Sequence, residues 1–203
     1  DLPTLHIWGP PQALRDCEHW MSDAAKAELH PLHPGDTIAL DTGVGSYAVR
    51  ALASSHSTGN GDVHAEDALL YDITGPNATR LLYATDTAAL SKATLTQLAG
   101  RRFDIAFIEE TFGLVTDHGT GHHDLRMLES TLHGLRATHA IADDTRVIAI
   151  HMSHHNPPLE QLRPLLQDMG VDVVDDGCVI AIGADARPGR HLVIGGARSG
   201  KSR

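Results

Sequence analysis

The sequence contains no long hydrophobic run, very little cysteine and no excess of basic residues. No stretch of about 18 apolar residues occurs, so a membrane span is not expected. The chain does not start with a basic segment followed by an apolar one, so a signal peptide is not expected either. Cys17 and Cys178 are too few for a disulfide framework, and a reducing cytoplasm is the expected compartment. The net charge of −10 argues against binding to nucleic-acid phosphates.

Histidine is the residue type that stands out among those present. The sequence has 15 histidines against 16 lysines and arginines together, and histidine is the commonest metal ligand among side chains. The other proportions, 41% hydrophobic and 21% charged residues, are ordinary for a globular protein. A length of 203 residues suffices for one domain with a sizeable core, or for one domain and part of another. Most of the histidines are expected at the surface, so the question is which ones lie where chemistry can occur.

The spacing of apolar and turn-forming residues predicts a run of strands, followed by helices that alternate with strands. In the first part of the chain, strands are expected at 4–8, 37–41, 47–53, 68–73 and 80–85, and a helix at 10–21. In the second part, helices are expected at 91–99, 121–138 and 158–169, and strands at 103–108, 147–150, 171–174 and 178–182. Residues 22–36 show a mixed pattern. This order indicates sheets covered by helices, a layered α/β architecture.

Apolar strands of this pattern lead into residues that can bind a metal ion. Three of them end at, or shortly before, His56, Asp86 and His151. Ligands gather where strand ends converge in an open α/β sheet, and rigid strands hold them in place. Two histidines and a carboxylate suit a divalent ion such as Zn²⁺ or Mn²⁺. A fourth strand runs into Glu109 and Glu110, to which the pattern assigns no role.

Each candidate also has a plainer interpretation. His56 could be a loop histidine beside a glycine-rich turn, and Asp86 could cap a following helix. His122 falls in the first turn of the helix expected at 121–138, with Thr120 as its cap. The helix dipole would lower the pKa of an imidazole there, and the neutral ring could bond a phosphate, accept a proton or ligate a metal. The alternative is a solvated first turn.

Taken in order, these segments resemble the metallo-β-lactamase superfamily. The resemblance rests on the strand before His56, then "LLYATDTAAL", "GHHDL" and "VIAIHMSHHN", and it covers about residues 1–183. The branch it resembles most contains the phosphoribosyl cyclic phosphate phosphodiesterase. The resemblance implies a four-layer αββα sandwich and two divalent metal ions, Zn²⁺ or Mn²⁺.

The resemblance also implies roles for individual residues. His56 would bind the first metal, Asp86 would bridge both metals and His151 would bind the second. His122 would contact phosphate or relay a proton, and His154 lies where this branch often repeats a histidine. The implied activity is hydrolysis of a small phosphorylated, ribose-phosphate-type substrate, with a homo-oligomer left open. The alternatives are a carboxylic ester or lactone hydrolase of the same fold, or a non-catalytic domain that supports a nucleotide kinase.

One departure from the family is large. The signature His-x-His-x-Asp-His, which supplies much of both metal sites, does not occur in the sequence. The family places it shortly before a segment like "LPTLHIWGPPQAL", with which this chain begins, so we expect the motif upstream in the parent protein. These 203 residues would then carry about half of the ligands and could be inactive alone.

The last residues match a different motif. Residues 195–202 satisfy the P-loop pattern G-x-x-x-x-G-K-[ST] directly after an expected strand. Gly195 and Gly200 would shape the loop, Lys201 would reach the β- and γ-phosphates of ATP or GTP, and Ser202 would hold Mg²⁺.

The wording of this end, "LVIGGARSGKSR", resembles the start of cobinamide kinase/cobinamide-phosphate guanylyltransferase of cobalamin biosynthesis. We therefore expect a hydrolase domain at 1–183, a linker at 184–190 and the start of a nucleotide-binding domain at 191–203. The P-loop would function only in a longer protein that contains the rest of that domain.

Overall fold

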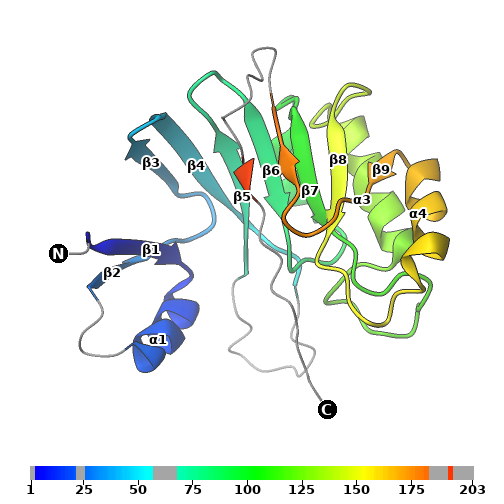
Figure 1. Cartoon of the computed structure of the whole chain (residues 1–203), viewed down its shortest axis with the longest axis horizontal. Helices are drawn as coiled ribbons and strands as arrows, with labels where there is room; N and C mark the ends of the chain where they lie inside the picture. The colour runs from blue at the N-terminus through cyan, green and yellow to red at the C-terminus, as the bar shows by residue number, and fades with distance from the viewer. Residues whose placement is uncertain (1–2, 22–25, 57–67, 183–191, 194–203) are drawn as a thin grey trace.

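The computed structural model describes residues 3–21, 26–56, 68–182 and 192–193 (Figure 1). The first elements are β1 (Leu5–Gly9), α1 (Pro11–Trp20), β2 (Ala27–Pro31), β3 (Thr37–Thr42), β4 (Gly45–Ala53), β5 (Leu69–Thr74) and β6 (Arg80–Ala84). They are followed by α2 (Lys92–Leu98), β7 (Ile105–Glu109), α3 (Leu125–Ala137), β8 (Arg146–Ile150), α4 (Leu159–Asp168), β9 (Val171–Asp172), β10 (Val179–Ile180) and β11 (Leu192–Val193).

A seven-stranded mixed sheet organises the described part of the chain. Its strand order follows the sequence, from β3 through β9. The pairs from β3 to β6 are antiparallel, and the pairs from β6 to β9 are parallel. Strands β4, β6, β7 and β8 therefore run in the same direction. Their carboxyl ends meet at one edge of the sheet, as the sequence pattern requires for a shared site.

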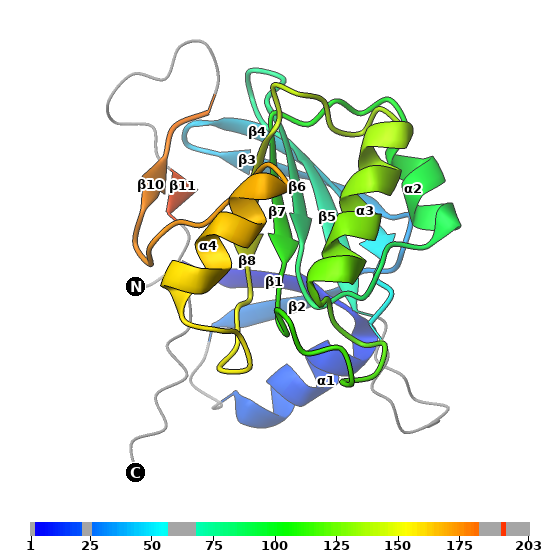
Figure 2. The ribbon, with the colours of Figure 1, turned by 90° about the vertical axis from the view of Figure 1, so that its right-hand side faces the viewer.

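The helices α2, α3 and α4 cover one face of this sheet (Figure 2). The side chains that fill this layer alternate along the strands, because successive strand residues point to opposite faces. The fully buried members include Leu52, Leu70 and Leu82 from the sheet, together with Leu128 and Leu132 from α3. This layer is the main hydrophobic core.

The other face of the large sheet carries a second, smaller sheet. Strands β1 and β2 pair in parallel, and Trp8 on β1 packs against a buried cluster of Leu32, Ala51 and Leu69, of which Ala51 and Leu69 point away from the helices. Both views place β1 and β2 between the large sheet and α1 (Figures 1 and 2). The layers therefore run helix, sheet, sheet, helix, which confirms the α/β sandwich expected from the sequence.

Three local expectations are wrong. Residues 27–31 form β2, although their pattern was mixed, because pairing with β1 supplies the hydrogen bonds that the short polar strand needs. Helix α3 begins at Leu125 rather than 121, since the Asp124 side chain caps it by accepting from Met127 N–H at 2.8 Å. Asp86 caps no helix, because α2 begins only at Lys92 with Ser91 as its cap.

At the far end of the described residues, β10 and β11 form an antiparallel pair. The expected linker at 184–190 and the P-loop residues Gly195, Gly200, Lys201 and Ser202 lie outside the described residues, so the domain boundary stays a prediction. No helix in the described part of the chain is long and apolar enough to cross a membrane.

Replacing Leu132 by alanine should lower the free energy of unfolding by about 3 kcal/mol, since the side chain is fully buried and its removal leaves a cavity. Chemical denaturation measures this change. The matched control is Leu114→Ala, at a side chain that is 62% exposed, where the change should stay within about 0.5 kcal/mol. Equal losses in the two variants would contradict the assignment of α3 to the main core.

Candidate metal centre

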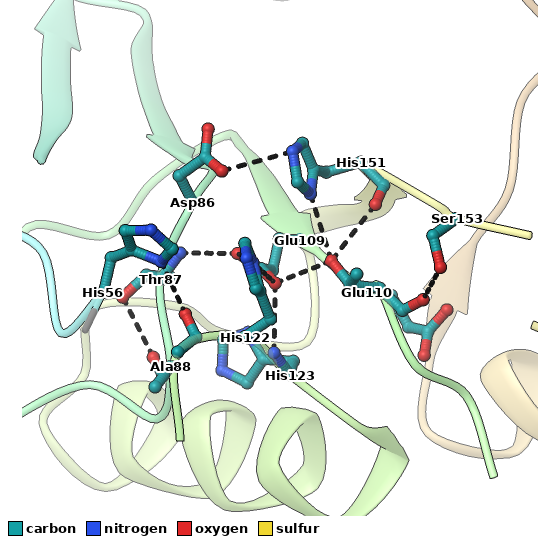
Figure 3. A network of polar contacts seen from close by, with 12 residues as sticks. His56, Asp86, Thr87, Ala88, Glu109, Glu110, His122, His123, His151 and Ser153 are labelled. Carbon is teal, nitrogen blue, oxygen red and sulfur yellow. Dashed lines mark hydrogen bonds and ion pairs between the residues drawn. The ribbon is translucent and has the colours of Figure 1, made fainter. Parts of the chain in front are cut away.

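The carboxyl ends of β4, β6 and β8 bring three predicted residues to one edge of the large sheet. His56 follows β4, Asp86 follows β6 and His151 follows β8 directly. His122, from the segment before α3, lies beside them (Figure 3). Residues from four distant parts of the sequence therefore share one small region.

Two of these residues hold an unusual backbone conformation. Asp86 has φ 48° and His151 has φ 58°, the left-handed region that L-residues rarely adopt. Such conformations cost free energy and persist only where surrounding contacts enforce them, often at functional sites. At Asp86 one such contact comes from a distant segment, because the Ser54 hydroxyl at the end of β4 donates to the Asp86 carbonyl. The chain turns sharply at both strand ends, which are the points where these side chains enter the site.

The donor atoms of Asp86, His122 and His151 lie within 4.8 Å of one another. His151 Nε2 is 3.2 Å from Asp86 Oδ1, and the rings of His122 and His151 are stacked with centroids 5.5 Å apart. The ring of His56 lies 4.7 Å from that of His122. The structure thus groups His122 directly with Asp86 and His151, while His56 adjoins the group through His122.

Glu109, at the end of β7, is a buried carboxylate that accepts hydrogen bonds from the segments around the site. Its side chain is fully buried, and its oxygens accept hydrogen bonds from four groups. The donors are Thr111 Oγ1 at 2.7 Å, His122 Nδ1 at 2.9 Å, His123 N–H at 3.0 Å and Thr87 N–H. A carboxylate satisfied in this way fixes the loops around it.

These contacts fix the tautomer of His122 and His56. A carboxylate can only accept, so His122 Nδ1 carries the hydrogen and its Nε2 keeps a lone pair. His56 Nδ1 lies 2.9 Å from the carbonyl oxygen of Gly121, which also only accepts, so the same assignment holds. Both rings therefore have Nε2 available as a ligand or a proton acceptor.

His151 reaches the same state through Thr111. The Thr111 hydroxyl has one hydrogen, which it gives to Glu109 at 2.7 Å, so at 3.0 Å it accepts from His151 Nδ1–H. The lone pair of His151 Nε2 then faces Asp86 Oδ1 at 3.2 Å. Two acceptors at this distance repel unless a cation or a proton lies between them. This geometry fits a divalent metal ion held by Asp86 and His151.

The donor set has the chemistry of a catalytic zinc or manganese site. Imidazole nitrogen and carboxylate oxygen are the ligands that such ions take, and outer hydrogen bonds to the ligand histidines orient them. Asp86, His122 and His151 are all partly exposed, so solvent reaches the group. The residues present therefore fit the metal that the sequence predicts.

Two buried titratable groups lie directly behind the centre. Burial lowers the pKa of His123 to about 4, and its Nε2 lies 2.8 Å from the hydroxyl of Thr131. Burial also raises the pKa of Glu110 to about 7, although the N–H of Gly113 bonds its carboxylate at 2.6 Å. The sequence predicted a helix dipole acting on His122, but His122 lies before the helix, so this cause is wrong.

The remaining residues differ in whether the sequence predicted them and in whether the structure places them at the centre. His154 is exposed, with its ring against that of His155 at 4.1 Å, and it does not join the group of donors. Sequence reasoning missed Thr111, and it noted Glu109 without assigning it a role. Their signal was the Glu109-Glu110-Thr111 run after an apolar strand, but only the structure shows which carboxylate turns toward the histidines.

A family model described as "Beta-lactamase superfamily domain" matches residues 2–152 of the chain. No curated protein matches the sequence.

Several solved structures share the fold. Unliganded yeast PDE1 has a TM-score of 0.64 at 15% identity, over 84% of this chain and 58% of that one. The metallo-β-lactamase fold protein YhfI from Bacillus subtilis has 0.60 at 13%, over 84% and 62%. An isothiocyanate hydrolase from Delia radicum gut bacteria has 0.60 at 17%, over 88% and 67%. The chain spans less than two thirds of the length of the first two, and identities this low show the fold alone.

Replacing Glu109 by glutamine should disturb the histidine tautomers and weaken metal binding by about 10- to 100-fold. Whichever way the new amide points, its NH₂ group faces a group that donated to Glu109. Two-dimensional NMR of the ring nitrogens in metal-free protein should show His56, His122 and His151 protonated at Nδ1. In the variant, His122 should be a mixture of the Nδ1–H and Nε2–H tautomers. Glu110→Gln is the control. A mixture of His122 tautomers in the unmodified chain would contradict the assignment of its hydrogen to Nδ1.

The pKa of Glu110 predicts how stability changes with pH. Its folded pKa of about 7 is above its ordinary 4.5, so its contribution is fully present below pH 4.5 and is lost as pH rises through 7. Glutamine cannot lose a proton. Glu110→Gln should therefore gain about 3 kcal/mol relative to the unmodified chain between pH 5 and pH 8.

Denaturation curves at several pH values measure this difference. The exposed Glu129 on α3 provides the matched control, because Glu129→Gln makes the same change of side chain at a position that is not buried. A difference for Glu110→Gln that stays constant between pH 5 and pH 8 would show that burial does not shift this carboxyl.

Proposed function

The chain belongs to the metallo-β-lactamase superfamily, and from this membership we propose that it is a metal-dependent hydrolase of small phosphoric diesters of the ribose-phosphate type. The observation that carries the proposal is the 3.2 Å approach of His151 Nε2 to Asp86 Oδ1, a separation that suits two ligands of one cation. Further support comes from His56 and His122, whose Nδ1 atoms are both engaged and whose Nε2 atoms form no hydrogen bond with the described residues.

The residues divide into ligands and a proton-handling group. Asp86, His151 and His56 would be the protein ligands of the divalent metal centre. A bound divalent ion supplies charge that stabilises a phosphoryl oxygen and lowers the pKa of a coordinated water. Zn²⁺ and Mn²⁺ suit this mixed nitrogen and oxygen set.

His122 has the geometry of a general base or acid. Its Nε2 can accept a proton or bond a phosphate oxygen, while its Nδ1–H stays bonded to Glu109 at 2.9 Å. When Nε2 takes a proton, the ring becomes positive, and the buried Glu109 carboxylate stabilises that charge. The pair therefore moves a proton at one defined atom and holds the ring still while it does so.

Two alternatives use the same residues. A carboxylic ester or lactone could occupy the same centre, because its carbonyl oxygen needs the same positive charge. A non-catalytic domain that supports a nucleotide kinase would keep the fold without turnover. The P-loop residues are compatible with the hydrolase and with this alternative, because both place a nucleotide-binding domain after the hydrolase domain, and nucleotide binding at Lys201 and Ser202 stays a prediction from the sequence.

The test measures hydrolysis of bis-p-nitrophenyl phosphate, p-nitrophenyl acetate and a small lactone, with Mn²⁺ or Zn²⁺, by this chain and by any longer form of the protein. The diester should be cleaved with the highest kcat/KM. His122→Ala should lower kcat about 100-fold or more, since the proton-handling group is lost. His151→Ala should lower metal affinity and activity together.

His133→Ala is the matched control, because His133 lies exposed on α3 and should be without effect. Preference for the acetate or the lactone would replace the proposed substrate class while keeping the centre. No turnover with either metal, or turnover that survives His151→Ala unchanged, would favour the non-catalytic domain and reject the proposal.

A further inference from the structure

We propose that His6, Glu28 and His30 form a second site for a divalent transition metal, on the small sheet of β1 and β2. The site is distinct from the centre at Asp86, since its residues lie on other strands. The parallel register places His6 opposite Glu28. His30 is two residues beyond Glu28, so it points to the same face of the strand. Three ligating side chains therefore lie on one face of a two-stranded sheet.

The distances among their donor atoms match a metal site. His6 Nδ1 lies 3.0 Å from His30 Nε2 and 3.4 Å from Glu28 Oε2, and His30 Nε2 lies 4.0 Å from Glu28 Oε2. Ligands at about 2.0 Å from a tetrahedral Zn²⁺ are separated by about 3.3 Å from one another. The observed triangle brackets this value, so small rotations of exposed side chains would complete the geometry.

The chemistry of the donors selects the kind of ion. Two imidazoles and one carboxylate favour Zn²⁺, Cu²⁺ or Ni²⁺, whereas Ca²⁺ and Mg²⁺ prefer sets made of oxygen alone. Three protein ligands leave a position for water. The plainer interpretation is a surface cluster of ion pairs between Glu28 and protonated histidines, which would contribute little to stability. The two interpretations differ in how the cluster responds to added metal.

Trp8 gives the cluster both rigidity and a reporter. Its indole is stacked on the His30 ring with centroids 4.7 Å apart and planes at 17°, and it lies 5.6 Å from the His6 ring. The indole also packs against the buried cluster of Leu32, Ala51 and Leu69. His30 is therefore held against a side chain that is itself anchored in the core. A paramagnetic ion at the cluster would quench the fluorescence of this indole.

A metal ion here would join two strands that are separated in the chain by α1. Strands β1 and β2 pair only with each other in the described part of the chain. An ion that binds the folded form alone stabilises it by mass action. The expected role is thus a clamp on the β1, α1 and β2 unit, independent of hydrolysis.

The experiment titrates the protein with Cu²⁺ and follows tryptophan fluorescence, then repeats thermal unfolding with and without Zn²⁺. Unmodified protein should show saturable quenching and a rise in Tm with Zn²⁺ that exceeds the rise in the double variant described next, since Zn²⁺ at the Asp86 centre stabilises both proteins. The double variant His6→Asn with His30→Gln should raise the apparent Kd for Cu²⁺ by about 100-fold or more, because two of three ligands are gone. Glu28→Gln should have a smaller effect in the same direction.

His33→Gln is the matched control, since His33 is an exposed histidine that pairs with Asp36 outside the cluster. It should leave quenching unchanged, and Trp8→Phe should remove most of it. Circular dichroism checks that the exposed substitutions leave the fold intact. Saturable quenching that survives the double substitution, or no quenching and no change in Tm with Zn²⁺, would overturn the proposal and leave the ion-pair cluster.

Discussion

The candidate centre depends on one buried carboxylate. A charge in the protein interior is tolerated only when hydrogen bonds satisfy it, and Glu109 is satisfied by donors from three separate segments. Those segments follow β6, follow β7 and precede α3. Because Glu109 accepts hydrogen bonds from all three segments, it holds these loops in position relative to one another. The orientation of His122, and through Thr111 that of His151, follows from the same contacts.

The strained backbone at two strand ends also determines where the candidate ligands lie. Asp86 and His151 both turn into the left-handed region immediately beyond their strands, a conformation that costs free energy at residues other than glycine. The sheet offsets this cost, because its parallel strands hold the two turns side by side at one edge. As a result, an imidazole nitrogen of His151 and a carboxylate oxygen of Asp86 face each other, and a cation between them would remove their repulsion.

The layered fold gives the molecule two separate regions of metal-ligating side chains. One face of the large sheet is buried under α2, α3 and α4, and the other supports β1 and β2. Trp8 belongs to both the contact between sheets and the His6, Glu28 and His30 cluster, so this exposed cluster is linked to the core. The two regions share no strand, and each can therefore be tested without altering the other.

The sequence by itself determined the layered α/β fold and most strands, because alternation and helical spacing are local properties. It also predicted that His56, Asp86 and His151 lie at strand ends, since each follows an apolar strand, and the structure brings these ends to one edge of the sheet, while their role as metal ligands stays a prediction. It failed for β2, whose pairing with β1 is not local, and for the start of α3, where Asp124 displaces the expected cap. Only the tertiary structure decided which carboxylate serves the histidines. Glu109 and Glu110 are identical neighbours in sequence, and the pleat of β7 together with donors from distant loops separates their environments.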